Sequence, residues 1–192
     1  ARADFVEKNP ETTKAVMRAV LKAQMWLDAS WENREEAIKF LAQDNYVKAP
    51  VNVLRKSMSG TFLYNPGIDS TNPMFNTFAN YYAAYPFYSH GMWFITQMYR
   101  WGQLTTPVDM KATIEKVYRP DLFAVVAKEV GYSLPESPWK KDGVDEYNKF
   151  IDGKVWDPNK AVEYIYDTFA VTSPVVSKED LMKVNNWTVT TK

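Results

Sequence analysis

Proline positions are the feature that most constrains how this 192-residue chain can fold. Six of its eleven prolines follow a residue that could cap or precede a helix. Proline is favoured at the first helical position, where its missing N–H group has no partner to lose. Helix starts are therefore predicted along the whole chain, at Asn9-Pro10, Ala49-Pro50, Asn72-Pro73, Thr106-Pro107, Arg119-Pro120 and Asp157-Pro158.

Apolar residues between these prolines recur with the helical period. Val16, Val20, Ala23 and Leu27 give one apolar face to a long helix over residues 10–28. The same spacing predicts shorter helices over residues 37–41, 51–58, 74–82, 93–101, 108–117, 122–130 and 162–169.

Capping residues mark the ends of these segments. Asn33 with Glu36 predicts a capping box, and Ser89 and Asp157 are expected to cap the helices that follow them. Glycines stand where three helical patterns stop, as left-handed C-caps do. These glycines are Gly60, Gly102 and Gly131.

Strand signals are few. Residues 61–64 form a short β-prone run, and an Asp-Gly turn inside residues 150–155 predicts a small hairpin. Residues 132–143 are expected to form a surface loop, and the tail after Thr172 to be extended or poorly ordered, with one turn capped by Ser177. The chain is thus mainly helical, with about eight helices whose apolar faces have no parallel sheet to cover. A piece that packs on a sheet supplied by missing sequence has this character.

Composition excludes several classes of function. The chain has no Cys, which excludes disulfides, zinc knuckles, iron–sulfur clusters and thiol nucleophiles. It has one His, which excludes multi-histidine metal sites. Lys plus Arg equals Asp plus Glu at 23 each, so no nucleic-acid footprint is expected. No apolar run approaches the roughly 20 residues of a membrane span. The chain starts at Ala1 rather than Met, which favours a mature protein or a fragment.

Catalytic motifs are missing as well. The sequence contains no G-x-S-x-G elbow, no Walker A segment and no G-x-G-x-x-G turn. Its paired carboxylates stand at expected helix starts, where they complement the helix dipole without any catalytic role. We therefore expect a protein that is not an enzyme, with no catalytic residue, no metal ligand and no cofactor.

The densest chemistry lies in residues 85–102, which hold the sole histidine. His90 and Arg100 could contact an anion near a helix N-terminus, where backbone N–H groups favour negative charge, with Trp93 beside them. The alternative is that His90 serves as a capping partner and the aromatic residues form packed core. Both interpretations remain open from the residues alone, and the predicted ligand contacts are His90, Trp93 and Arg100.

Three stretches resemble one known family. Residues 1–11, with Asp4-Phe5 followed by Pro10, are similar to the Asp-Phe-x-x-x-x-Pro helix entry of ABC-transporter binding proteins for nitrate, bicarbonate and sulfonates. Residues 85–102 resemble the Y-P-(F/Y)-x-S-H-x-x-W-F-(L/I)-T-x-x-x-R-W-G segment of the nitrate/bicarbonate branch. Residues 150–158 resemble the F-x-D-G-x-x-F-D-P element of that branch. Together the stretches span residues 1–170 in the family's order.

The resemblance implies an α/β periplasmic-binding-protein-like (type II) fold with two lobes around a cleft. Residues 1–170 would be the C-terminal part of such a protein, mainly helical with a few short strands, and residues 171–192 a tail. The N-terminal remainder of the same protein would supply most sheet strands and most ligand contacts. A charged residue that separates nitrate from bicarbonate binders in the family would fall before Ala1.

The function that the resemblance implies is capture of nitrate or a similar small oxyanion (bicarbonate, nitrite, cyanate) and delivery to an ABC permease. The location would be periplasmic, with a lipid anchor to the membrane as a further expectation. Nitrate has four heavy atoms, which at a ceiling of about 1.5 kcal/mol each give roughly 6 kcal/mol. Micromolar binding needs about 8 kcal/mol. A charged partner and closure of both lobes must therefore contribute, and this part alone is not expected to bind.

Two alternatives accompany this expectation. The same fold serves as a cytoplasmic nitrate sensor and as a regulatory domain of transporter ATPases, and the residues upstream of Ala1 would distinguish these from an importer component. An unrelated helical interaction domain is the other alternative. It predicts cooperative unfolding of the 192-residue chain alone.

Overall fold

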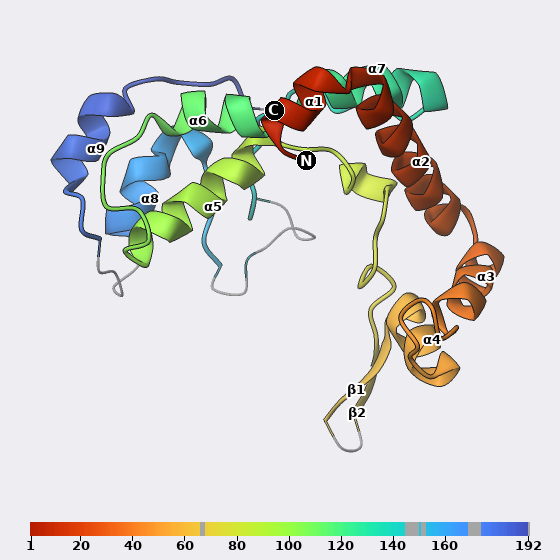
Figure 1. Cartoon of the computed structure of the whole chain (residues 1–192). Coiled ribbons are helices and arrows are strands. Elements are labelled where there is room, and N and C mark those ends of the chain that lie inside the picture. Colours follow the sequence, from red (N-terminus) through yellow and green to blue (C-terminus); the bar gives the residue numbers. More distant parts are fainter. Residues whose placement is uncertain (66–67, 145–149, 151–152, 169–173, 192) are drawn as a thin grey trace. The chain divides into compact units, whose positions relative to one another are not determined.

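The computed structural model describes residues 1–192 except 66–67, 145–149, 151–152, 169–173 and 192, and two compact units make up the chain. Unit 1 comprises residues 1–85 and 124–134, and unit 2 comprises residues 86–123 and 135–192. Among the described residues both units are mainly helical, as predicted, and the one sheet has two strands (Figure 1).

Unit 1 is a succession of helices followed by a hairpin. Its elements are α1 (Ala3–Lys8), α2 (Pro10–Ala29), α3 (Trp31–Leu41), α4 (Val51–Ser59), β1 (Thr61–Asn65), β2 (Ile68–Thr71), the 3₁₀ turn η1 (Asn80–Tyr82) and most of α7 (Pro120–Val130). β1 pairs antiparallel with β2, from Thr61 opposite Thr71, with an irregularity near the turn.

Unit 2 is built around one long helix. Its elements are α5 (Tyr88–Arg100), α6 (Met110–Val117), the first turn of α7, the 3₁₀ turn η2 (Pro158–Lys160), α8 (Ala161–Asp167) and α9 (Lys178–Val184). No helix in the described part of either unit is long and apolar enough to cross a membrane.

Several predicted boundaries are confirmed. Pro10, Pro120 and Pro158 each begin a helix or a 3₁₀ turn. Gly60 ends α4 with φ +68°, and a Cβ there would lie 1.7 Å from the Asn72 carbonyl oxygen, so only glycine fits. The predicted caps Gly102 and Gly131 likewise have positive φ, at +66° and +75°.

Two predicted caps are wrong. Ser30 caps α3, because its hydroxyl accepts a hydrogen bond from the Asn33 N–H at 3.2 Å, and Asn33 lies inside the helix. α5 begins at Tyr88, one residue before the predicted cap Ser89. The Ser89 hydroxyl instead accepts a hydrogen bond from the Lys140 N–H at 3.3 Å. For Ser89, a tertiary partner thus replaces the local capping role.

The helix predicted over residues 74–82 is also wrong. Residues 73–79 form turns and bends, and only η1 is helical. The reason is a long-range partner: the N–H groups of Phe78, Ala79 and Asn80 donate to the Asp28 carboxylate at 3.0, 2.7 and 2.8 Å. Three successive N–H groups that converge on one oxygen cannot also continue a helical ladder.

The C-terminal predictions have mixed outcomes. The hairpin expected over residues 150–155 lies partly outside the described residues. Beside it, Asp142 and Trp156 form a single antiparallel bridge. Ser177 does cap a helix, as predicted, but α9 has seven residues rather than one turn, and its Leu181 is fully buried. The described part of the tail therefore contributes to the core of unit 2.

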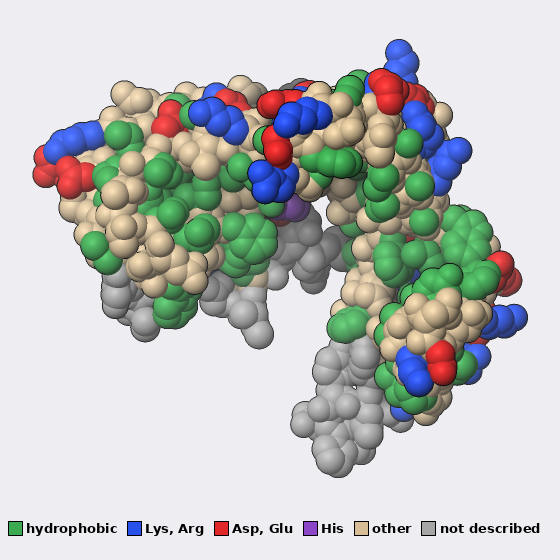
Figure 2. Space-filling view, viewed as in Figure 1, with side chains coloured by type: hydrophobic (Ala, Val, Ile, Leu, Met, Phe, Trp, Pro, Cys, Tyr) green, Lys and Arg blue, Asp and Glu red, His purple; other side chains and the backbone are tan. Residues whose placement is uncertain are grey.

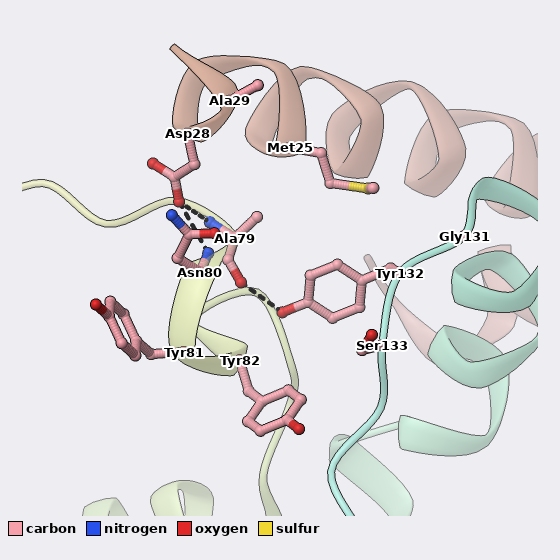
Figure 3. Close-up of a pocket in the computed structure, with 10 residues that line it drawn as sticks. All are labelled: Met25, Asp28, Ala29, Ala79, Asn80, Tyr81, Tyr82, Gly131, Tyr132 and Ser133. Atoms are coloured by element: carbon pink, nitrogen blue, oxygen red, sulfur yellow. Dashed lines mark hydrogen bonds between the residues drawn. The ribbon is translucent and has the colours of Figure 1, made fainter. Parts of the chain in front are cut away.

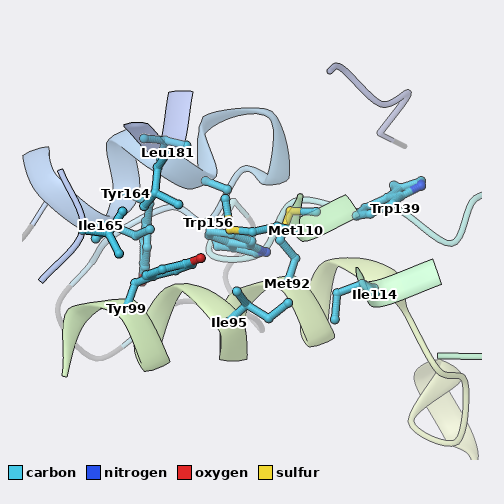
Figure 4. Close-up of a cluster of buried hydrophobic side chains, with 13 residues drawn as sticks. Met92, Ile95, Tyr99, Met110, Ile114, Trp139, Trp156, Tyr164, Ile165 and Leu181 are labelled. Atoms are coloured by element: carbon cyan, nitrogen blue, oxygen red, sulfur yellow. The ribbon is translucent and has the colours of Figure 1, made fainter. Parts of the chain in front are cut away.

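A cluster of buried apolar side chains forms that core (Figure 4). α5 presents Met92, Ile95 and Tyr99 to α6 and α8, and the Tyr99 hydroxyl donates to the Thr106 carbonyl oxygen at 2.8 Å. Burial of a large apolar side chain stabilises a fold by about 1.5–3 kcal/mol. The other members that Figure 4 labels are Met110, Ile114, Trp139, Trp156, Tyr164, Ile165 and Leu181.

Candidate functional site

α5 brings two of the predicted contacts into one pocket. His90 and Trp93 are three residues apart, so they lie on the same side of the helix. Together with four residues from its surroundings they line a pocket of roughly 280 Å³ within unit 2. The other lining residues are Phe94, Asp142, Phe150 and Trp156.

Hydrogen bonds hold the aromatic walls of this pocket in place. The Trp93 indole N–H donates to the Tyr164 hydroxyl at 3.2 Å, and the Trp156 indole N–H donates to the Ser89 carbonyl oxygen at 3.1 Å. The Trp156 and Tyr164 rings meet edge to face, with their centroids 5.0 Å apart. The walls are therefore preformed, and most of the lining is apolar.

The polar end of the pocket carries a carboxylate whose partners are cationic or imidazole groups. Asp142 lies 2.6 Å from the Lys140 ammonium and 3.6 Å from the His90 Nε2 atom. The Lys140 ammonium also lies 4.9 Å from the centre of the Phe87 ring. The positive charge at this end is thus already balanced by Asp142.

The surroundings of His90 disfavour its charged form. Burial lowers its pKa below the ordinary 6.5, Lys140 lowers it further, and Asp142 opposes both effects in part. The His90 side chain is still 44% exposed, so its ring can reach a solute. It would act there as a neutral hydrogen-bond donor rather than as a charge.

Arg100 occupies a different place. It lies at the last residue of α5, is 9% exposed, donates to the Gln97 side-chain oxygen at 2.7 Å and stacks on the Trp101 ring. Ten residues of helix separate it from His90, a rise of about 15 Å. One nitrate ion cannot span that distance, so the structure does not bring the three predicted contacts together.

A second pocket, in unit 1, was missed from the sequence (Figure 3). It measures roughly 490 Å³ and lies between the end of α2, the η1 segment and the turn after α7. Its lining residues are Met25, Asp28, Ala29, Ala79, Asn80, Tyr81, Tyr82, Gly131, Tyr132 and Ser133.

Asp28 organises this second pocket. One of its oxygens accepts the three backbone N–H groups described above, and the other pairs with the Arg34 guanidinium at 2.6 Å. Burial by itself would raise the pKa of Asp28, but these hydrogen bonds hold it below the ordinary 3.8. An acid in the last turn of a helix opposes the helix dipole. That position was the signal in the sequence for a specific partner.

The η1 segment is strained. Tyr81 and Tyr82 have φ values of +56° and +60°, a region that side chains other than glycine seldom adopt. The Tyr132 hydroxyl donates to the Ala79 carbonyl oxygen at 2.8 Å and helps to hold the segment (Figure 3). Within the described residues, no group of three or more acidic or histidine side chains could hold a metal ion.

Comparison with known proteins gives consistent matches. Residues 1–42 match the model of the NMT1-like family. The chain is 35% identical over 165 residues to the nitrate/nitrite binding protein NrtA of Synechococcus elongatus. This aligned region covers 85% of this chain and 36% of that protein. It is 28% identical over 173 residues to the bicarbonate-binding protein CmpA of the same species.

A solved structure shares the architecture. The crystal structure of the periplasmic nitrate-binding protein NrtA from Synechocystis matches with a TM-score of 0.77 and 31% identity. The match covers 86% of this chain and 43% of that one. The chain thus spans well under half the length of the relatives it matches. The fold class is that of a portion of a periplasmic binding protein, as the sequence predicted.

Proposed function

We propose that this chain, which is similar to nitrate- and bicarbonate-binding proteins, is part of the solute-binding component of an ABC importer for nitrate or a similar small oxyanion. The observation that carries the proposal is the match to NrtA, in sequence at 35% identity and in structure at a TM-score of 0.77. The relatives named for solute binding are not enzymes, and we extend that to this protein.

The relatives favour nitrate over bicarbonate as the solute. Three NrtA proteins are 35%, 32% and 32% identical to the chain, against 28% for CmpA. Capture would proceed by closure of two lobes around the anion, followed by docking to a membrane permease. The periplasmic location of NrtA extends to this protein on the same argument, with a lipid anchor as a further part of the proposal.

The contacts predicted in unit 2 divide into two competing assignments. His90, with Trp93 as a neighbouring wall, offers a neutral donor that is exposed to solvent. Arg100 offers a full charge, but it is largely buried and already bonded to Gln97. Because one ion cannot reach both, at most one assignment can hold.

A second candidate function, a regulatory domain of a transporter ATPase, is supported by a separate sequence match. The chain is 32% identical over 170 residues to the nitrate import ATP-binding protein NrtC of Synechocystis, of which it covers 24%. A regulatory domain joined to a transporter ATPase therefore remains an alternative, as does a cytoplasmic sensor of the same fold. The sequence encoded upstream of Ala1 separates them: a signal peptide or lipobox supports the importer, an ATPase domain supports the second function, and neither supports the sensor.

Calorimetry on the complete natural protein tests the proposal. We expect nitrate to bind with a dissociation constant near or below 1 μM, which corresponds to about 8 kcal/mol, and bicarbonate to bind at least about tenfold more weakly. Absence of a binding heat with nitrate, nitrite and bicarbonate would overturn the solute-binding role. Tighter binding of bicarbonate would overturn the choice of anion.

The same titration separates the two contact assignments. His90→Ala and Arg100→Met are compared with Lys128→Met, which removes an exposed charge from α7. The variant that removes a true contact should weaken nitrate binding about tenfold or more, equivalent to about 1.4 kcal/mol. If neither variant differs from the control, both assignments are wrong while the solute-binding role stands. Circular dichroism confirms that each variant is folded.

A further inference from the structure

Residues 185–191 follow α9 without forming a helix or a strand, and none of their side chains is charged. Trp187 and Val189 pack against the buried cluster of unit 2, while the residues on either side of each are exposed. This period of two is typical of an extended chain that lies along a surface. The preceding helix α9 differs, because it buries Leu181 and keeps its charged side chains at the surface (Figure 2).

Side chains, rather than another strand, bind the backbone of this segment. Within the described part of the chain, no backbone-to-backbone hydrogen bond joins residues 186–191 to another element. Instead, the Asn159 Nδ2 atom in η2 donates to the Val189 carbonyl oxygen at 2.9 Å, and the Asn159 Oδ1 atom accepts from the Val189 N–H at 2.7 Å. The Ser137 hydroxyl donates to the Thr190 carbonyl oxygen at 3.1 Å. An amide that pairs with both groups of one residue imitates a neighbouring strand, as in the recognition of extended peptides.

Asn185 fixes the point where the segment leaves α9. Its Oδ1 atom accepts a hydrogen bond from the Met110 N–H at 2.9 Å, and its Nδ2 atom donates to the Val108 carbonyl oxygen at 3.0 Å. The first N–H groups of a helix have no partner within the helix, so Asn185 satisfies one of them at the start of α6. The segment is therefore attached to unit 2 at both of its ends.

The segment is nevertheless separate from the core that it covers. The buried members of the cluster all come from other parts of unit 2, and Trp187 and Val189 are only partly buried. A gap of roughly 50 Å³ lies beside Trp187, against η2 and α8. Protein interiors contain few gaps larger than a water molecule, so this contact is looser than the packing inside the core.

We propose that residues 185–191 are a strap, an extended segment held in cis by a peptide-recognition site of unit 2, from which it can detach while the core stays folded. The site fits an uncharged segment with apolar side chains at two alternate positions, with Asn159 bonded to its backbone. A tethered segment has an effective concentration on the order of millimolar, so contacts that would be weak between separate molecules keep the site filled. The inference does not depend on which solute the protein binds.

A peptide supplied in trans tests this site in the complete protein. Trp187→Ala weakens the strap but leaves the site itself intact, and Trp31→Ala, at an exposed tryptophan of unit 1, is the control. The probe is a synthetic peptide of residues 185–191 with both ends capped, and its control is the same peptide with Trp187→Ala. Val189→Ala serves as a second, smaller change in the strap. Calorimetry measures binding of the peptides, and hydrogen exchange measures opening of the strap.

We expect the Met110 amide, which bonds to Asn185, to exchange at least about tenfold faster in Trp187→Ala, while the α5 amides are unchanged. The unaltered peptide should bind this variant at least about tenfold more tightly than the altered peptide does, and should restore slow exchange. The Trp31→Ala protein should not bind the peptide, because its own strap fills the site.

Three results would overturn the inference. Equal binding of the two peptides, or equal binding of the unaltered peptide to Trp187→Ala and Trp31→Ala, would exclude the recognition site. Loss of α5 protection in both strap variants would show that the segment is part of the core. Slow exchange that disappears when the wild-type protein is diluted would exclude occupancy in cis, since the segment would then come from a second copy.

Discussion

Units 1 and 2 are stabilised by different kinds of interior. Unit 2 buries an aromatic and aliphatic cluster around Trp156 and Tyr99, and the Trp156 indole N–H and the Tyr99 hydroxyl are both hydrogen-bonded. Unit 1 instead contains the largely buried Asp28–Arg34 ion pair and leaves Val16 and Val20 of α2 more than half exposed. The difference indicates that unit 2 contains an apolar core of its own, whereas unit 1 depends more on a polar anchor at Asp28.

The largest loss of stability is expected from a substitution in the core of unit 2. Trp156→Ala removes a side chain that is 1% exposed together with its hydrogen bond to Ser89. Loss of a buried aromatic residue costs about 3–5 kcal/mol. Urea unfolding of the complete protein, followed by circular dichroism, measures this. Trp31→Ala, at an exposed tryptophan in unit 1, should cost less than about 1 kcal/mol. Similar losses for both variants would contradict the contrast between the units.

Removal of the Asp28 charge should cause the next largest loss of stability. Asp28→Asn leaves the Arg34 guanidinium buried without its anion, and breaking a buried pair in this way costs about 3–5 kcal/mol. The loss should appear as reduced hydrogen-exchange protection in unit 1, with α5 unchanged. Asp44→Asn, in an exposed pair with Lys48, is the control and should change nothing measurable. A neutral Asp28→Asn would show that the pair does not organise unit 1.

The same carboxylate predicts a pH dependence. Because the folded pKa of Asp28 is below its ordinary value of 3.8, its contribution to stability is complete above that value. The contribution is lost as the pH falls below 3.8 through the folded pKa. Acid titration of wild type and Asp28→Asn should therefore show the difference in stability shrinking as the pH falls. A constant difference would contradict the assignment.

A smaller loss of stability is expected from a substitution at the contact between α5 and α6. A Cβ on Gly91 would lie 2.6 Å from the Tyr118 ring and 2.8 Å from the Ile114 side chain. Gly91→Ala should therefore overpack this contact and cost about 1–3 kcal/mol, measured by urea unfolding. An unchanged or raised midpoint would show that the two helices can separate freely.

The smallest effect is expected for an exposed ion pair of unit 1. The Arg18 guanidinium donates from its Nε to Glu129 at 2.7 Å, with both side chains more than a third exposed. Glu129→Gln should cost less than about 1 kcal/mol and lose its effect in high salt. A larger loss would mean that surface charge, and not only the buried pair, stabilises unit 1.

Local features of the sequence predicted much of the fold. Pro10, Pro120 and Pro158 begin elements where expected, and Gly60 ends α4, because each residue acts through its own backbone preference. The errors arose where a distant partner decides the conformation. Residues 74–82 have helical spacing, but three N–H groups within them, those of Phe78, Ala79 and Asn80, donate to Asp28, which precedes Phe78 by 50 residues.

The candidate sites show the same limit. His90 and Trp93, two of the predicted contacts, line one pocket in the structure, but the approach of Asp142 and Lys140 to His90 follows only from the fold. The pocket around Asp28 joins three segments that no local pattern connects. Whether any of these residues contacts an anion stays a prediction.

Hydrogen exchange tests the contrast between the units most directly, by comparing the complete protein with the 192-residue chain alone. The account predicts that α5 amides are similarly protected in both, while α2 amides gain strong protection only in the complete protein. Equal protection of α2 in both would contradict it, because the exposed apolar residues Val16 and Val20 would then gain no cover in the complete protein.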